Sequence, residues 1–150
     1  MRVVIQRVKH AQVAINGKIH SQIKTGLLVL LGITHDNNEA DADWLVQKIC
    51  NMRIFDDESG VMNHSVVDIN GEVLVVSQFT LMAATQKGNR PSYIRAARPE
   101  HAKPLYEYFI AQLNQSFNHL VGTGEFGADM QVTLLNDGPV TILMDTHNKE

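Results

Sequence analysis

The chain contains a single cysteine, Cys50, and no long hydrophobic run. One thiol cannot form an internal disulfide, and it leaves no second thiolate for a metal site. No apolar stretch approaches the roughly 18 residues that a membrane-spanning helix requires. The opening residues 1–7 alternate and carry charge, where a secretory signal would be continuously apolar. These absences predict a protein of a reducing, cytoplasmic compartment with no membrane partner.

The familiar catalytic motifs are also missing. The sequence has no Gly-x-Ser-x-Gly, no His-Glu-x-x-His and no glycine-rich phosphate loop. No two histidines stand four residues apart, so we expect surface histidines rather than metal ligands or general bases. A Ser/His/Asp triad finds no support in the sequence. The scattered histidines are His10, His20, His35, His64, His101, His119 and His147.

The net charge of −3 excludes a chain that is basic throughout, but the charges are unevenly distributed. Seven acidic and two basic residues lie between positions 36 and 58. Between 86 and 103 a single acid, Glu100, faces five basic residues: Lys87, Arg90, Arg95, Arg98 and Lys103. This pattern is compatible with solvated loops or with a local patch that contacts the phosphates of a short nucleic-acid segment.

Most of the chain is predicted to form short strands. Asn16-Gly17 and Asn70-Gly71 each stand between apolar segments and predict hairpins, because both residue types tolerate the positive φ of a type I′ turn. Residues 26–33 are nearly all apolar, which is typical of a strand covered on both faces. The predicted strands are 3–8, 11–15, 18–23, 26–33, 66–69, 72–79, 130–135 and 140–145.

Two helices are predicted, at 39–52 and 99–118. In the second, apolar residues recur every four positions: Leu105, Phe109, Leu113 and Phe117. No linker divides the chain, and 150 residues can bury a sizeable core. We therefore expect one α/β domain over residues 1–150, a layered fold with a mixed, barrel-like β-sheet and two main helices.

Two short segments carry an unusual density of polar residues. Ser77-Gln78-Phe79-Thr80-Leu81 ends an apolar strand with polar side chains on both faces. Asn136-Asp137-Gly138-Pro139-Val140-Thr141 joins two predicted strands. Taken singly, the first is compatible with a hydrogen-bonded strand end. The second is compatible with a plain turn, since Asn, Asp, Gly and Pro are the usual turn residues.

Together the two segments resemble the two signature motifs of the D-aminoacyl-tRNA deacylases, the D-tyrosyl-tRNA deacylase family. Residues 1–8, 87–92 and 123–130 are similar to the same family, so the resemblance runs nearly end to end. It implies hydrolysis of the ester between a D-amino acid, or glycine, and the 3′-terminal adenosine of tRNA. It further implies a homodimer, with no metal and no organic cofactor.

The resemblance also implies the site residues. Ser77, Gln78, Phe79 and Thr80 would form the catalytic segment. Gly138 and Pro139 would be joined by a cis peptide and would reach into the partner's pocket, where their rigid carbonyls reject L-amino acids. Lys87, Arg90 and Arg95 are candidates for tRNA contacts. Phe126 is another, because either it or Phe79 could stack on the adenine.

Two mechanisms remain open at this stage. Backbone N–H groups after Phe79 and Thr80 could stabilise the oxyanion while water attacks with help from the ribose 2′-hydroxyl. Alternatively the Thr80 hydroxyl is the nucleophile, although a threonine needs a neighbouring base and the sequence offers none. Competing functions are an RNA-binding module without activity, a general small esterase and a purely structural oligomer.

Overall fold

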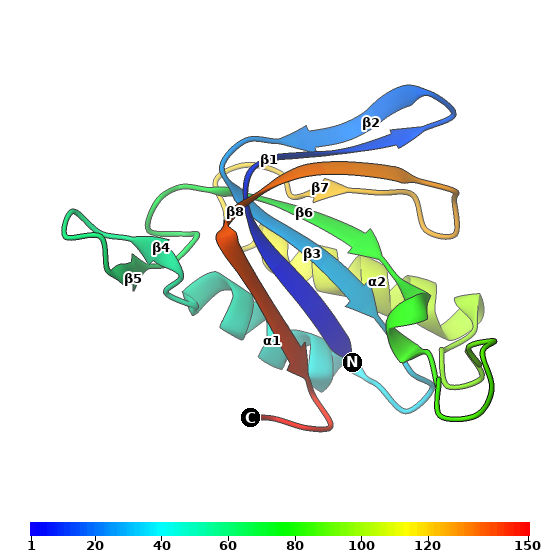
Figure 1. Ribbon diagram of the computed structural model, residues 1–150. Helices are drawn as coiled ribbons and strands as arrows, with labels where there is room; N and C mark the ends of the chain where they lie inside the picture. The colour runs from blue at the N-terminus through cyan, green and yellow to red at the C-terminus, as the bar shows by residue number, and fades with distance from the viewer.

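The computed structural model describes all residues, 1–150, and shows a strongly curved mixed sheet with two helices on one side (Figure 1). The long strand β1 (Arg2–Ile15) is central and pairs antiparallel with β2 (Lys18–Ile23), β3 (Gly26–Gly32) and β8 (Gln131–Asp145). Strand β3 pairs in parallel with β6 (Glu72–Ser77), which pairs in parallel with β7 (Gly122–Thr123). The predicted α/β fold with a mixed, barrel-like sheet and two main helices is confirmed, and the sheet is nearly closed.

The helices α1 (Glu39–Asn51) and α2 (Pro99–Asn114) cover one face of this sheet. Asn38 caps α1: its side chain accepts from the Ala40 N–H, and Asp41 accepts from the Asn38 N–H. Helix α2 ends at Asn114, four residues before its predicted end, and Phe117 packs against the core from outside the helix. No helix is long and apolar enough to cross a membrane.

Strand β3 is buried on both faces, as its apolar sequence predicted. Leu27, Val29 and Leu31 face the helices in the main core, whereas Leu28 belongs to a second, smaller core. The second core forms where the curved sheet folds over itself and brings the start of β8 above β3 and β6. The carboxyl ends of β3 and β6 therefore lie between two packed layers.

The predicted strand at 66–69 and the predicted hairpin at Asn70-Gly71 are wrong. Residues 66–69 form a turn in which Asp68 accepts from the Ser65 N–H, and the strand of this region is β5 (Met62–His64), paired with β4 (Phe55–Asp56). Asn70 has the expected positive φ of 50°, but no hairpin follows it. The reason is that β6 finds its partner in the distant strand β3, with which it pairs in parallel.

The last two predicted strands are instead one strand, β8, and no turn separates them. Along β1 the pairing advances two residues, from Gln6 to Val8, while along β8 it passes from Thr141 to Asn136, which is five. The extra residues form a bulge opposite β1. The turn-forming residues Asp137, Gly138 and Pro139 are thus used to make a bulge inside a strand.

Candidate active site

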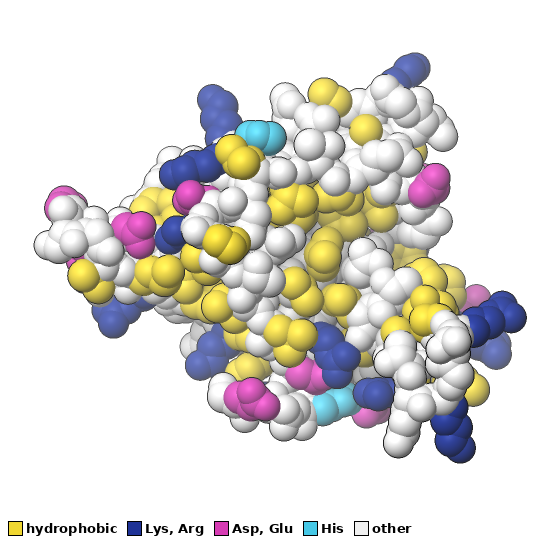
Figure 2. Space-filling view, in the orientation of Figure 1, with side chains coloured by type: hydrophobic (Ala, Val, Ile, Leu, Met, Phe, Trp, Pro, Cys, Tyr) yellow, Lys and Arg dark blue, Asp and Glu magenta, His cyan; other side chains and the backbone are white.

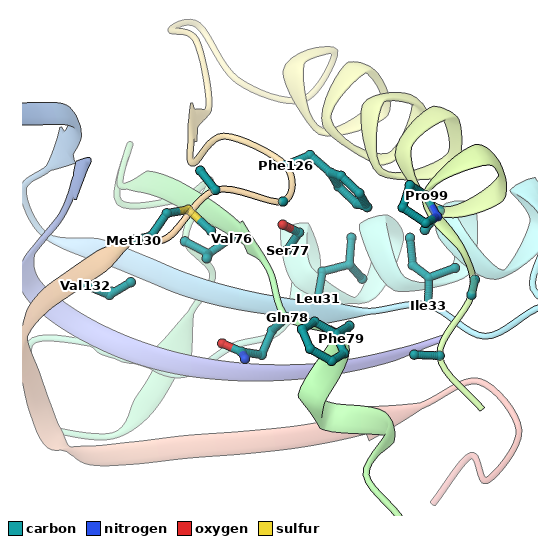
Figure 3. A pocket seen from close by; sticks show the side chains of 15 residues that line it. Leu31, Ile33, Val76, Ser77, Gln78, Phe79, Pro99, Phe126, Met130 and Val132 are labelled. Carbon is teal, nitrogen blue, oxygen red and sulfur yellow. The ribbon is translucent and has the colours of Figure 1, made fainter. Parts of the chain in front are cut away.

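A cavity of about 490 Å³ opens where β3 and β6 end (Figure 3). It lies on the face where Figure 2 shows hydrophobic side chains along a central hollow. Eleven of its fifteen lining residues are hydrophobic, and the lining includes no Asp, Glu, His, Cys, Lys or Arg. The lining comprises Leu31, Ile33, Val76, Ser77, Gln78, Phe79, Ala96, Ala97, Pro99, Ala102, Phe126, Gly127, Ala128, Met130 and Val132.

Three of the four predicted catalytic residues, Ser77, Gln78 and Phe79, line this cavity. Strand β6 ends at Ser77, two residues before its predicted end. The Gln78 N–H then donates to the Leu31 carbonyl at 2.7 Å, and a short 3₁₀ turn, η1 (Phe79–Met82), follows. Figure 3 shows Ser77 beside Val76, with Gln78 and Phe79 at the start of η1. The segment is therefore a strand end that turns sharply at the cavity wall.

The fourth residue, Thr80, is not part of the lining. In an extended chain, side chains would alternate between the two faces of the strand. The 3₁₀ turn η1 ends this alternation after Gln78, and Thr80 lies within the turn. The Thr80 hydroxyl accepts a hydrogen bond from the Gln78 side-chain amide. An amide N–H cannot remove a proton from this hydroxyl, and no carboxylate or imidazole lines the cavity.

The first backbone N–H groups of η1 have no acceptor within the turn, as at the start of any helix. Inside the turn region, Leu81 donates to the Gln78 carbonyl and Ala83 donates to the Thr80 carbonyl. No loop, cap or side-chain hydrogen bond satisfies the N–H groups of Phe79 and Thr80. The start of η1 therefore presents the N–H group of Phe79, which lines the cavity, and that of Thr80 next to it.

The position of η1 depends on Gly32 and Arg2. A Cβ at Gly32 would lie 2.9 Å from Met82 Cε and 3.1 Å from the Gln78 carbonyl oxygen, so only glycine lets the turn pack this closely on β3. Arg2 Nη1 donates to the Leu81 carbonyl at 2.8 Å. The same guanidinium donates through Nε to Asp145 at 2.9 Å and pairs with it through Nη2 at 2.8 Å. Arg2 therefore ties the turn to the end of β8.

The electrostatics of this link favour the charged carboxylate. Burial alone would raise the pKa of Asp145, but the hydrogen bond from the His147 N–H and the Arg2 guanidinium outweigh it. The pKa of Asp145 consequently lies below its ordinary value of 3.8. Asp145 stays ionised at neutral pH and holds the Arg2 side chain in place.

Phe126, a predicted tRNA contact, forms the opposite wall of the cavity. Its ring packs on Tyr106 of α2, with centroids 5.7 Å apart. The Tyr106 hydroxyl is buried and donates to the Val75 carbonyl at 2.9 Å, and burial raises the pKa of this phenol to about 12. Tyr106 therefore supports the Phe126 ring from behind, and the half-buried ring still lines the cavity.

The predicted basic contacts lie outside the cavity. Lys87, Arg90 and Arg95 are exposed residues of the loop that joins η1 to α2. None of them lines the cavity, but the same loop contributes Ala96 and Ala97 to its wall. The positive charge thus lies beside the cavity opening.

Gly138 and Pro139 are exposed and do not line the cavity of their own chain. Their peptide bond is cis, as the resemblance implied. Val132, at the cavity, pairs with Val13, whereas Asn136 pairs with Val8. At about 3.3 Å per residue, five residues along β1 place Asn136 roughly 16 Å from Val132 along the sheet. The second motif is therefore remote from the first within one chain.

The buried side chain of Arg7 anchors this bulge. Its Nε donates to the Asp137 carbonyl at 3.2 Å, and its Nη1 donates to the Ile54 carbonyl at 2.7 Å. The Asn136 side-chain amide adds donors to the carbonyls of Arg7 and Val140. The bulge therefore projects outward on a rigid base.

The sequence reasoning missed Arg2, Arg7 and Tyr106. Arg7 had a usable signal, because it follows Val3 and Ile5 at the two-residue spacing of a strand face whose other members are buried. A charged residue in such a series predicts a buried, hydrogen-bonded cation. Arg2 and Tyr106 carried no comparable signal, since their partners lie far away in the chain.

The comparisons with known proteins agree with this geometry. A family model described as D-Tyr-tRNA(Tyr) deacylase matches residues 4–145. Proteins named D-aminoacyl-tRNA deacylase from Cytophaga hutchinsonii and Bacteroides thetaiotaomicron are 63% and 60% identical over 150 residues, covering 100% of both chains in each case.

Two solved structures share the fold. One, titled c-Myc DNA Unwinding Element Binding Protein, has a TM-score of 0.92 and 42% identity, covering 97% of this chain and 99% of the other. The other, a probable eukaryotic D-amino acid tRNA deacylase, has a TM-score of 0.80 at 16% identity, covering 95% and 97%, and it shows the fold alone. With the matching family model and the full-length relatives, these findings establish that the chain belongs to the D-aminoacyl-tRNA deacylase family.

Proposed function

We propose that this protein hydrolyses the ester that joins a D-amino acid, or glycine, to the 3′-terminal adenosine of tRNA. The observation that carries the proposal is an apolar cavity that has no ionisable side chain in its lining and lies against the N-terminal end of η1. An aminoacyl ester is already activated, so its hydrolysis requires charge stabilisation and positioning more than acid–base catalysis. The family's substrate class fits this arrangement.

The N–H groups of Phe79 and Thr80 form the oxyanion hole in this proposal. Hydrogen-bond donors fixed in an apolar, water-poor site stabilise a developing oxyanion strongly, because they do not have to reorient during the reaction. The Gln78 side chain donates an amide N–H to the Thr80 hydroxyl. Its side-chain carbonyl oxygen can then accept a hydrogen bond from the substrate's ammonium group. The Ser77 hydroxyl lines the same wall and can orient the ester.

Water is the nucleophile, assisted by the ribose 2′-hydroxyl of the substrate. The hydrogen bond that the Thr80 hydroxyl accepts and the absence of a base in the lining support this assignment. We expect Thr80→Ala to retain substantial single-turnover deacylation, within about tenfold of the wild type, because the backbone N–H survives the substitution. A loss of four orders of magnitude, with folding and substrate binding intact, would instead identify Thr80 as the nucleophile.

Stereospecificity requires Gly138 and Pro139 of a second subunit. Within one chain these residues lie far along the sheet from the cavity, yet they project outward on the base that Arg7 anchors. Their backbone carbonyls, which little side-chain bulk surrounds, would obstruct an L side chain, while a D side chain would point to solvent. Such an obstacle cannot reject glycine, which has no side chain to exclude. The active unit is therefore a homodimer.

The loop with Lys87, Arg90 and Arg95 would contact phosphates near the acceptor end. Few such contacts suffice for the single-stranded 3′ end that all tRNAs share, which suits a chain with a net charge of −3. Phe126, supported by Tyr106, would stack on the terminal adenine inside the cavity. Deacylation should accordingly weaken as the salt concentration rises.

Time courses of hydrolysis with D-tyrosyl-, L-tyrosyl- and glycyl-tRNA test this function directly. We expect the purified chain to deacylate the D- and glycyl substrates and to spare the L-substrate, with a solution mass of two chains. Binding without hydrolysis would favour an RNA-binding module. Rapid cleavage of p-nitrophenyl esters would favour a general esterase, and a monomer with full enantioselectivity would exclude the role of the second subunit.

A further inference from the structure

An apolar side chain stands exposed at the tip of the basic loop. The backbone turns at residues 93–96, where the Ala96 N–H donates to the Tyr93 carbonyl at 2.9 Å. Ile94 and Arg95 occupy the tip of this turn. Ile94 is 84% exposed, which is unusual for an isoleucine on an ordered turn. No role in the proposed hydrolysis accounts for it.

The tip is continuous with the cavity opening. Next to Ile94, the Tyr93 ring packs edge-on against Phe79, with centroids 5.1 Å apart and planes inclined by 74°. Phe79 itself is 57% exposed and lines the cavity. After the tip, Ala96 and Ala97 continue into the cavity wall. An apolar path thus leads from the cavity, over Phe79 and Tyr93, to Ile94.

The turn is held firmly enough to act as a surface. On one side, Ala84 and Ser92 exchange backbone hydrogen bonds at 2.8 and 2.9 Å. On the other side, the Ala97 N–H donates to the Ile33 carbonyl at 2.9 Å, and Ala96 forms a β-bridge with Thr34. These bonds attach the turn to the ends of η1 and β3, the elements that form the cavity.

The charges around this path identify its occupant. Arg95 adjoins Ile94 at the tip, and Lys87, Arg90 and Arg98 belong to the same loop, whereas 83–98 contains no acid. Figure 2 shows Lys and Arg side chains beside hydrophobic ones where this loop lies. Exposed apolar side chains among cations match single-stranded nucleic acid, whose bases stack while its phosphates pair with Lys and Arg.

We propose that Tyr93 and Ile94 form a packing surface for the nucleotide that precedes the terminal adenosine of the tRNA. The inference deepens the proposed function and rests on it: with the esterified adenosine in the cavity, the preceding nucleotide leaves across Phe79 and Tyr93. Its base packs on Ile94, and its phosphate lies near Arg95. The surface contributes to substrate affinity and not to the chemical step.

Ile94→Ser tests the proposal with two substrates, D-tyrosyl-tRNA and the minimal ester D-tyrosyl-adenosine. Loss of one base-packing contact weakens substrate binding without altering the reacting atoms, so we expect KM for the tRNA to rise about tenfold with kcat unchanged. The kinetics with the adenosine ester should stay at the wild-type level. Leu120→Ser is the matched control, because Leu120 is 86% exposed on a different loop and should alter neither substrate.

Tyr93→Phe keeps the ring on Phe79 and should resemble the wild type, whereas Tyr93→Ala should follow Ile94→Ser. Equal effects of Ile94→Ser on both substrates, or none on either, would overturn the proposal. A shift of Ile94→Ser from dimer to monomer would also overturn it, by showing that a protein subunit covers Ile94. If the wild type hydrolyses neither ester, the proposed function fails, and the packing surface is then tested by binding alone. Tenfold weaker binding of a CCA oligonucleotide by Ile94→Ser would support the surface, and unchanged binding would refute it.

Discussion

The turn η1 and the bulge 136–141 carry the two motifs, yet the fold treats them in opposite ways. Turn η1 is held against the end of β3, beside an apolar cavity, and begins with the N–H groups of Phe79 and Thr80. The bulge is held equally firmly by Arg7, but it faces outward and adjoins no part of that cavity. In the proposed mechanism, the first region works within one chain, whereas the second acts only on the cavity of a second copy.

The comparison separates two kinds of function. Under the proposed function, the N–H groups of η1 accelerate hydrolysis of any ester that enters the cavity. The bulge adds only an obstacle, and so it changes which enantiomer enters. Damage to η1 should therefore lower the rate for all substrates, and damage to the bulge should raise the rate for the wrong enantiomer.

Gly138→Ala should have the largest effect on selectivity. Gly138 has φ +123°, and an added Cβ would lie 2.8 Å from Val140 Cγ2 and 3.0 Å from the Val140 nitrogen, so the bulge must move. We expect the ratio of D- to L-tyrosyl-tRNA hydrolysis to fall about 100-fold, equivalent to about 3 kcal/mol of discrimination. Gly17→Ala is the control: Gly17 has φ +75° in a remote hairpin with nothing within 4 Å. Equal losses of selectivity in both variants would refute a specific role for the bulge.

Arg2→Gln should have the next largest effect, on rate rather than on selectivity. Removing the guanidinium releases the Leu81 carbonyl and loosens η1. We expect kcat for D-tyrosyl-tRNA to fall about tenfold, or about 1.4 kcal/mol in the barrier, with KM and the D-to-L ratio unchanged. The double variant Arg2→Asp with Asp145→Arg can restore the ion pair but not the donor to Leu81. Full recovery of kcat in that variant would assign the effect to the ion pair alone.

Asp145→Asn should have the smallest effect, on stability and its pH dependence. The pKa of Asp145 is lower in the folded chain than in the unfolded chain, so its ionised form stabilises the fold above the unfolded value. As the pH falls through the folded pKa, below the ordinary 3.8, this contribution disappears. We expect the variant to unfold about 1 kcal/mol more easily at pH 7 and no more easily once the pH lies below the folded pKa of Asp145. A difference that persists in acid would contradict this account.

Local signals predicted the elements whose partners are close in the sequence. Asn16-Gly17 produced the hairpin of β1 and β2, and the helix predicted at 39–52 ends within one residue of its predicted end. Asn70-Gly71 failed because β6 pairs with β3, whose paired residues lie 46 positions earlier in the chain. A dipeptide determines its own backbone angles, but it carries no information about a distant strand that competes for the same hydrogen bonds.

The site divides along the same line. Ser77, Gln78 and Phe79 were identified from their motif and do line the cavity, whereas Thr80 was identified and does not. The difference arises because η1 replaces an extended strand, and η1 can pack there only because Gly32 lacks a side chain. The supports Arg2 and Tyr106 escaped prediction for a related reason: each acts through a carbonyl of a strand or turn that only folding brings near.

The sequence by itself determined which chemical groups this protein can use: polar residues at one strand end, a Gly-Pro segment with small side chains, and one basic loop. The tertiary structure alone decided where those groups stand. Closure of the sheet buries Arg7, places Phe126 opposite Phe79 and leaves Gly138 outside the cavity. The physical reason is that residue type sets the local backbone preference and charge. Position depends on burial and strand pairing between residues far apart, whose free energy exists only once the whole sheet has formed.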